Sequence, residues 1–170
     1  LARLRESGAR VEYRRVDVSD AAAVRALIAD IRDRYDILHG VLHSAGIIRD
    51  GFLLKKTAEE FASVLAPKVQ GVANLDAATA DLELDCFVLF SSGASVTGNV
   101  GQADYATGNA FMDEYARYRN ERVRAGERRG ITVLRKGPRP EHLKTLRAVG
   151  ALDHLAHENH LFTTLDAAVT

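Results

Sequence analysis

The stretch from Asp85 to Tyr118, DCFVLFSSGASVTGNVGQADYATGNAFMDEYARY, carries the pattern that decides the fold. It opens with an unbroken apolar run, which is typical of a parallel strand covered on both faces. The run ends in hydroxyl side chains, and a helix is predicted to follow. Tyr105 and Asn109 lie one turn apart on that helix and therefore share a face. A buried strand, a small polar turn and a helix in succession favour an α/β fold.

The same alternation of strand and helix continues on both sides of this stretch. Strands are predicted at 10–18, 37–46, 85–92, 131–137 and 160–162, and helices at 1–8, 20–35, 58–80, around Tyr105 as far as Gly126 or Gly130, at 139–152 and from 163. Strict alternation predicts a three-layer, Rossmann-like (doubly wound) parallel sheet with right-handed crossovers. In such sheets a ligand binds at the carboxyl ends of the strands.

Three predicted strands end in small or polar residues, and these ends mark the expected site. The three ends read VDVSD (16–20), LHSAG (42–46) and LFSSG (89–93). Because parallel strands point the same way, all three ends should open on one edge of the sheet. We expect function to reside at that edge.

Local signals place several helix ends. Ser19 or Asp20 is expected to cap the helix that follows, and Thr57 with Glu60 makes a capping box for the helix from residue 58. Pro67 lies inside that helix and is expected to kink or interrupt it. Cys86, in the apolar run, is interpreted as a small buried thiol.

Composition excludes several classes of function. The 170 residues suit one domain, and equal numbers of basic and acidic residues, 23 each, provide no electrostatic reason to expect nucleic acid. No apolar stretch approaches the roughly 18 residues of a membrane span. A single cysteine excludes a disulfide framework or a thiolate metal site. A cytoplasmic setting is expected.

The residues at the strand ends can be interpreted in two ways. Tyr105 beside Ser92 could polarise and protonate a carbonyl oxygen, but a phenol is a weak acid at neutral pH and needs a neighbouring cation. Lys68 is the candidate cation, since its helix should pack beside the Tyr105 helix. The alternative is ordinary helix surface. Similar alternatives hold elsewhere: Asp17 as a cap and His43 as a packed core residue.

Three blocks resemble a known family: HSAGIIRDGFLLKKT (43–57), LAPKVQG (65–71) and FVLFSSGASVTGNVGQADYATGNAFMDEYA (87–116). Together they resemble the ketoreductase domains of modular polyketide synthases, which belong to the short-chain dehydrogenase/reductase superfamily. The resemblance covers about residues 1–131. In other short-chain dehydrogenases the lysine follows the tyrosine by four residues. Here Asn109 holds that position and Lys68 lies upstream, as in the synthase ketoreductases.

The resemblance implies NADPH-dependent reduction of a 3-ketoacyl thioester, bound to an acyl carrier protein, to the 3-hydroxyacyl form. Tyr105 would donate a proton to the ketone oxygen and Ser92 would hydrogen-bond that oxygen. Lys68 would hold the nicotinamide ribose and assist the phenol. Asn109 would complete a proton relay.

The resemblance also implies contacts beyond the catalytic residues. Asp17 and Val18 match the family's adenine contact, while Ser44, Ala45 and Gly46 match the small-residue turn that the cofactor passes. Asp50 matches the last aspartate of the motif associated with the B-type stereochemical course. Thr97 stands where the A type has tryptophan. A D-configured 3-hydroxyl product is therefore expected.

Two departures from the family pattern limit these expectations. The 170 residues contain no glycine-rich phosphate turn at their start, so the first βαβ unit of the family is expected to be lacking, and activity of this chain alone to be weak or absent. The segments 10–18 and 37–46 must then pair differently than in the family. From about residue 129 to 170 the chain resembles instead the carboxyl-terminal half of a STAS domain of sulfate-permease-type transporters.

The STAS-like segment, 131–170, would close the ketoreductase-like core, 1–130, as a βαβα unit within one domain. The chain would then be a natural or engineered chimera. A non-catalytic STAS-like interaction module and a chimeric fold without activity are the alternatives to an enzyme. His142, His154, His157 and His160 are interpreted as surface residues, not metal ligands. An unpaired sheet edge could support a homodimer.

Overall fold

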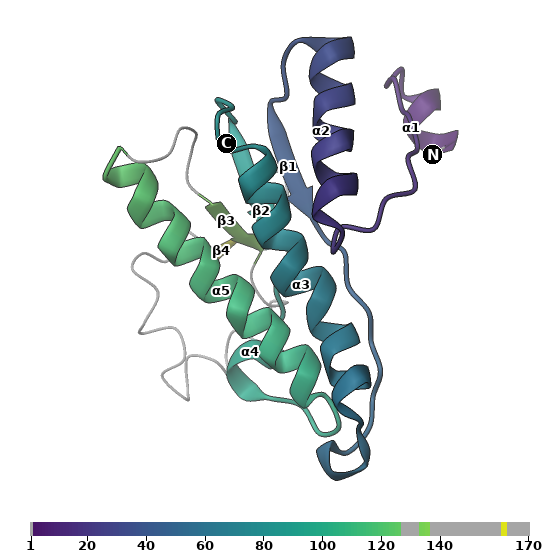
Figure 1. Ribbon diagram of the computed structural model, residues 1–170, viewed down its shortest axis with the longest axis vertical. Coiled ribbons are helices and arrows are strands. Elements are labelled where there is room, and N and C mark those ends of the chain that lie inside the picture. Colours follow the sequence, from purple (N-terminus) through teal and green to yellow (C-terminus); the bar gives the residue numbers. More distant parts are fainter. Residues whose placement is uncertain (1, 127–132, 137–160, 163–170) are drawn as a thin grey trace.

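The computed structural model of the chain describes residues 2–126, 133–136 and 161–162 (Figure 1). The helices are α1 (Ala2–Glu6), α2 (Ala21–Tyr35), the 3₁₀ turn η1 (Leu53–Lys55), α3 (Ala58–Ala78), α4 (Ala94–Thr97) and α5 (Ala103–Arg124). The strands are β1 (Gly40–His43), β2 (Cys86–Leu89), β3 (Val133–Lys136) and β4 (Leu161–Phe162). The predicted alternation is confirmed from α2 to β3. The helices predicted at 139–152 and from 163 lie outside the described residues.

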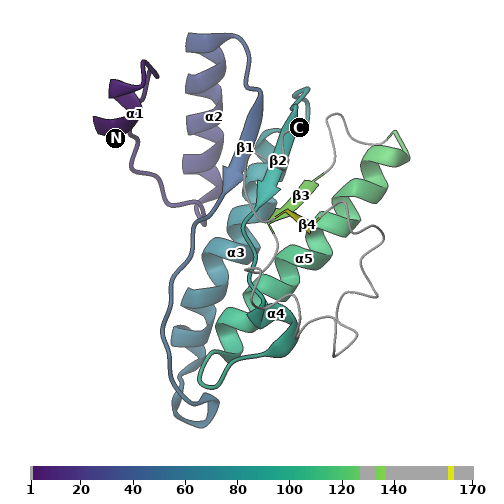
Figure 2. The same ribbon diagram turned by 180° about the vertical axis from the view of Figure 1, so that it is seen from behind.

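The four strands form one parallel sheet in the order β1-β2-β3-β4. Val41 pairs with Phe87 and Phe87 with Val133, so β2 is a central strand, as its apolar run predicts. The two opposite views show α2, α3 and α5 on one face of the sheet (Figures 1 and 2). The described elements therefore make two layers. The second helical layer of the predicted three-layer arrangement is not among them.

The core lies between that helical layer and the sheet. Its apolar side chains come from α2, α3, α5, the first two strands and the segment just before β2. Its buried members are Val24, Ile28, Val41, Val72, Leu75, Leu84, Phe87, Leu89, Met112 and Ala116. On the other face of β1, Leu42 is 52% exposed, which agrees with the absence of a covering helix there among the described residues.

Most predicted helix ends are confirmed. Asp20 is the cap of α2, where its carboxylate accepts from the backbone N–H groups of Ala22 and Ala23. The capping box of Thr57 and Glu60 is formed at the start of α3. Helix α5 ends before Gly126, whose φ of 73° lies in the left-handed region that glycine adopts freely.

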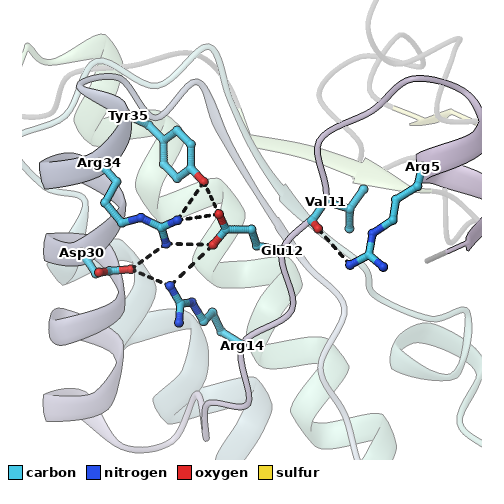
Figure 3. Close-up of polar contacts among 7 residues, drawn as sticks. All are labelled: Arg5, Val11, Glu12, Arg14, Asp30, Arg34 and Tyr35. Carbon is cyan, nitrogen blue, oxygen red and sulfur yellow. Dashed lines mark hydrogen bonds and ion pairs between the residues drawn. The ribbon is translucent and has the colours of Figure 1, made fainter.

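The strand predicted at 10–18 is wrong. These residues form no helix and no strand, and they pair with no strand among the described residues. Side chains attach the segment to α2 instead: Glu12 accepts from Arg34 at 2.5 Å and from the Tyr35 hydroxyl at 2.5 Å (Figure 3). The Arg34 guanidinium, with Tyr35, lowers the pKa of Glu12 to about 2. An extended segment becomes a strand only where a neighbouring strand offers its backbone groups.

The interruption predicted at Pro67 is also wrong, because α3 runs as one helix from Ala58 to Ala78 with Pro67 inside it. Pro67 is buried together with its neighbours Val64 and Lys68. Packing of this face against the sheet and α5 offsets the one helical hydrogen bond that proline cannot donate. Cys86, predicted to be buried, is half-buried.

Strand β1 stands at one end of the sheet order, so its outer edge has no partner strand within the described part of the chain. A homodimer through this edge stays a prediction. None of the described helices is long and apolar enough to cross a membrane.

Candidate active site

The candidate site forms where α3 and α5 pack against each other, beside the carboxyl ends of β1 and β2. The two helices lie side by side in both views (Figures 1 and 2). Gly108 permits the close approach, since a Cβ there would stand 3.0 Å from Cδ of Lys68. The lysine side chain thus passes along α5 toward Tyr105 and Asn109.

Lys68, Tyr105 and Asn109 are brought together as the sequence predicts. The Lys68 ammonium donates to Oδ1 of Asn109 at 3.1 Å and lies 5.3 Å from the centre of the Tyr105 ring. Asn109 is fully buried, and its amide nitrogen donates to the Tyr105 carbonyl at 2.7 Å. One amide side chain therefore contacts both the lysine and the turn of helix that carries the tyrosine.

The environment of Lys68 acts on its charge in two opposite ways. The residue is only 4% exposed, and this burial lowers the pKa of its ammonium, while the negative charge of Asp113 acts to raise it. An ammonium has three N–H donors. Among the described residues Asn109 accepts one of them, which leaves donors for a hydroxyl-bearing ligand.

Ser92 lies at the end of the segment that follows β2. Its Oγ accepts from the backbone N–H of Ala94 at 3.2 Å, at the start of α4. The preceding hydroxyl, Ser91, donates to the Asn109 carbonyl at 3.3 Å and so connects this strand end to α5. Ser92 is half-buried beside the site, and no described contact joins it to Tyr105.

Asp17 and Val18 lie where the chain turns into α2. The Asp17 carboxylate accepts from the backbone N–H of Ser19 at 2.8 Å, so it holds its own turn. The Val18 carbonyl accepts from the Asn74 amide at 3.0 Å, which ties the turn to α3. The turn is therefore anchored beside the helix that carries Lys68.

The turn after β1 approaches Lys68. A Cβ on Gly46 would lie 3.6 Å from the lysine nitrogen, so this residue leaves the space over the ammonium open. Ser44 is exposed and Ala45 half-buried. His43, at the end of β1, is 3% exposed and packs against α3, as expected of a core residue. Burial, followed by the charge of Lys68, lowers the pKa of His43 to about 4.

Asp50 is exposed and lies on the loop between β1 and α3, against the start of α5. Its carboxylate accepts from the Gln102 amide at 2.9 Å. The next residue, Gly51, donates its N–H to the Gly101 carbonyl at 2.9 Å. The loop that carries Asp50 is therefore in contact with the turn that precedes Tyr105.

Three charged residues of this region were not among the predicted site residues. Asp113 accepts from Ser95 at 2.6 Å, and Lys56 pairs with Asp104 at 2.5 Å. The spacing could have indicated Asp113, since it lies four residues after Asn109 on the same helical face. Lys56 and Asp104 are 48 residues apart, and no local pattern joins them.

The described residues contain no group of three or more histidine, cysteine or acidic side chains that could hold a metal ion. The four carboxyl-terminal histidines interpreted as surface residues lie outside the described part of the chain. The structure thus brings together a buried cation, an amide and a phenol near the carboxyl ends of parallel strands.

Comparison with known proteins defines the class to which this arrangement belongs. Residues 1–129 match the KR domain family. The chain therefore belongs to the ketoreductase domains of polyketide synthases, within the short-chain dehydrogenase/reductase superfamily. The first of the two predicted resemblances is confirmed.

Individual relatives are similar over most of the chain. The chain is 55% identical to polyketide synthase PksN of Bacillus subtilis (strain 168) over 133 residues, 78% of this chain and 2% of that protein. It is 47% identical to PksL of the same organism, again over 133 residues, 78% of the chain and 3% of that protein. The chain thus spans a small fraction of the synthases it matches.

Solved structures agree with this assignment. A ketoreductase domain from the bacillaene assembly line is 41% identical, with a TM-score of 0.77 over 88% of this chain and 38% of that one. An N-terminal ketoreductase from the macrolactin assembly line is 32% identical, with a TM-score of 0.74 over 95% of this chain and 35% of that one. A short-chain dehydrogenase/reductase from Burkholderia phymatum shares the fold at 23% identity, with a TM-score of 0.74 over 81% of this chain and 51% of that one.

The STAS resemblance and the chimera interpretation find no support in these comparisons. The macrolactin ketoreductase covers 95% of the chain, which is more than residues 1–131 alone. Strands β3 and β4 continue the same parallel sheet as β1 and β2. A Rossmann-like fold accounts for them without a second family.

Proposed function

We propose that this chain carries the proton-transfer half of an NADPH-dependent carbonyl reduction. The substrate class is a 3-ketoacyl thioester carried on an acyl carrier protein, and the product is the 3-hydroxyacyl thioester. Membership of the ketoreductase family supports the reaction type. The observation that carries the proposal is the buried Lys68 ammonium, in contact with Asn109 and beside the face of Tyr105.

The roles of the side chains follow from their chemistry and position. Tyr105 donates its hydroxyl proton to the ketone oxygen, and Ser92 donates a hydrogen bond to the same oxygen. The positive charge of Lys68 stabilises the phenolate that proton release creates. Asn109 fixes the lysine and completes a relay that returns a proton to Tyr105 through water.

The residues present fit the nicotinamide-ribose end of the cofactor. NADPH, when bound, supplies the hydride. Lys68 has N–H donors for ribose hydroxyls, and Gly46 leaves space over its ammonium. Ser44 and Ala45 continue that turn, and Asp17 with Val18 supplies the adenine contact. Asp50, on the loop against α5, directs the substrate toward the D-configured product.

Binding of the phosphates is expected to be weak in this chain, because no glycine-rich phosphate turn lies within its 170 residues. Turnover by the chain alone is therefore expected to be slow. Binding and chemistry must be measured separately for this reason.

The test is a fluorescence titration of NADPH with the 170-residue chain, followed by oxidation of NADPH with trans-1-decalone as a surrogate ketone. Lys68→Ala is expected to weaken NADPH binding about tenfold, since it removes a charge-assisted hydrogen bond. Tyr105→Phe should leave binding unchanged and lower the reduction rate by about 10² or more. Lys55→Ala is the matched control, because Lys55 is an exposed lysine on the 3₁₀ turn η1 of the loop between β1 and α3.

Equal binding by wild type and Lys68→Ala would reject the proposed role of the lysine. Equal reduction rates for wild type and Tyr105→Phe would reject the proposed chemistry. A chain that binds no NADPH at millimolar concentration would be non-catalytic by itself.

A further inference from the structure

The loop between β1 and α3, residues 47–56, is fastened to the start of α5 at three points. Two of them are the contacts of Asp50 with Gln102 and of Gly51 with Gly101. Gly101 has a φ of 77°, in the left-handed region that glycine adopts freely, and a Cβ there would lie in contact with the Gly51 backbone, 3.4 Å from its nitrogen. The donors in these two contacts, the Gln102 amide and the Gly51 N–H, carry no charge, and Asp50 is exposed.

The third point is a buried ion pair. The Lys56 ammonium lies 2.5 Å from the Asp104 carboxylate, and the two side chains are 5% and 1% exposed. Lys56 also donates to the Arg49 carbonyl within its own loop. The lysine therefore ties the loop to itself and to α5 at once.

The Asp104 carboxylate serves two partners with its two oxygens. One oxygen accepts from Lys56, and the other accepts from the backbone N–H of Tyr105 at 2.9 Å. A single side chain thus joins the loop of Asp50 to the backbone of the proposed proton donor. Displacement of the loop and displacement of the tyrosine are coupled through it.

The cost of removing this pair from water indicates that it fixes the relative position of the loop and α5. Removing two charges from water costs free energy that their attraction only partly offsets, so a buried pair is weak evidence for stability alone. The neighbouring Lys55 is exposed and shows that a lysine at this loop can remain in water. The best attested use of a buried polar pair is to select one relative position of two elements.

We propose that Lys56 and Asp104 are positioning residues that hold the Asp50 loop in register with Tyr105 and thereby set which face of the ketone is reduced. The inference rests on the proposed carbonyl reduction and deepens it. Neither residue touches the reacting atoms. They act through the loop and through the Tyr105 backbone.

The test compares Lys56→Met and Asp104→Asn with the wild-type chain, using Lys55→Met as the control and Lys56→Arg as the conservative variant. The first readout is hydrogen–deuterium exchange of residues 47–56. The second is the ratio of the two hydroxyl configurations formed from a 3-ketoacyl N-acetylcysteamine thioester, together with kcat and KM.

Both pair variants are expected to raise loop exchange at least tenfold and to shift the configuration ratio at least tenfold toward an even mixture. Lys56→Arg should restore most of the ratio, and Lys55→Met should match wild type. NADPH binding should not change, which separates positioning from loss of the fold.

Unchanged loop exchange and an unchanged ratio in both variants would overturn the inference. If Lys56→Met also raises exchange throughout α2, that variant has unfolded. The test then rests on Asp104→Asn, which preserves the shape of the side chain. If the wild-type chain binds NADPH and still forms no hydroxy product, the proposed reduction fails, and exchange of the loop alone decides whether the pair holds it.

Discussion

At the scale of single residues, the proposed chemistry depends on the charge of Lys68. Four groups face this ammonium: Asn109, the Tyr105 ring, Asp113 and His43. His43 has a pKa of about 4 and is neutral near pH 7. Asp113 is therefore the group whose charge opposes the effect of burial on the pKa of Lys68. We infer that Asp113 keeps the lysine charged.

Asp113→Asn is expected to lower the pKa of Lys68 further, since it removes the negative charge that raises it. NADPH binding should therefore weaken at a lower pH in the variant than in the wild-type chain. In both chains this loss of binding should occur below pH 10.5, the ordinary pKa of lysine. Ser95→Ala, which removes the hydroxyl that donates to Asp113 but keeps its charge, is the control.

A stability measurement checks the same shift without activity. A lysine whose pKa is lower in the folded chain binds fewer protons there than when unfolded. Stability should therefore rise with pH between the lowered pKa and 10.5. In Asp113→Asn this rise should begin at lower pH, as followed by thermal unfolding. Identical pH profiles for both chains would contradict the role of Asp113.

At the scale of elements, the site depends on the pairing of β1 with β2, which aligns their carboxyl ends. Gly40 stands opposite Cys86 in the register. A Cβ at Gly40 would lie 2.5 Å from the Cys86 sulfur, so the glycine makes room for the half-buried thiol. The small residue at the start of β1 thus matches a larger one at the start of β2.

Gly40→Ala is expected to destabilise the chain by about 1–3 kcal/mol, because the new methyl group overlaps the sulfur and forces the strands apart. Urea unfolding of the variant measures this loss. The double variant Gly40→Ala with Cys86→Ala should regain most of it, since the sulfur is then gone. A double variant as unstable as the single one would show that the backbone, not the thiol, limits the space.

At the scale of the whole molecule, buried polar contacts fix α3 against α5 at two places along their length. One is Lys68 with Asn109 at the site, and the other is Asp76 with Arg119 at 2.8 Å, far along the same two helices. Arg119 is 1% exposed and also lies over the Phe87 ring, 4.7 Å from its centre. The second pair therefore joins both helices to the central strand.

Arg119→Met is expected to cost about 3–5 kcal/mol of unfolding free energy, since it leaves the buried Asp76 carboxylate without its cation. Asp76→Asn combined with Arg119→Met should recover part of the loss. Arg117→Met, on an exposed ion pair of the same helix, should leave the free energy of unfolding nearly unchanged, because water screens that pair. Urea denaturation of the three variants measures these changes in the free energy of unfolding. A small loss in Arg119→Met would show that the pair is replaceable.

Much of this arrangement could be predicted from local patterns. The unbroken apolar run of β2 predicted a central parallel strand, and the spacing of Tyr105 and Asn109 placed both on one helical face. Asp20, Thr57 and Glu60 marked helix starts, because caps and periodicity act within a few residues. The predicted pairing of Lys68 with this face needed only that sequential α/β helices pack as neighbours.

The sequence by itself thus determined the alternation of helix and strand from α2 to β3, the central β2 and the face that carries the candidate site. Only the tertiary structure decided that residues 10–18 attach to α2 by side chains and that α3 continues through Pro67. It alone revealed the pair of Lys56 with Asp104. A strand needs a partner, a proline's cost depends on what packs around it, and residues 48 positions apart meet only when the chain has folded.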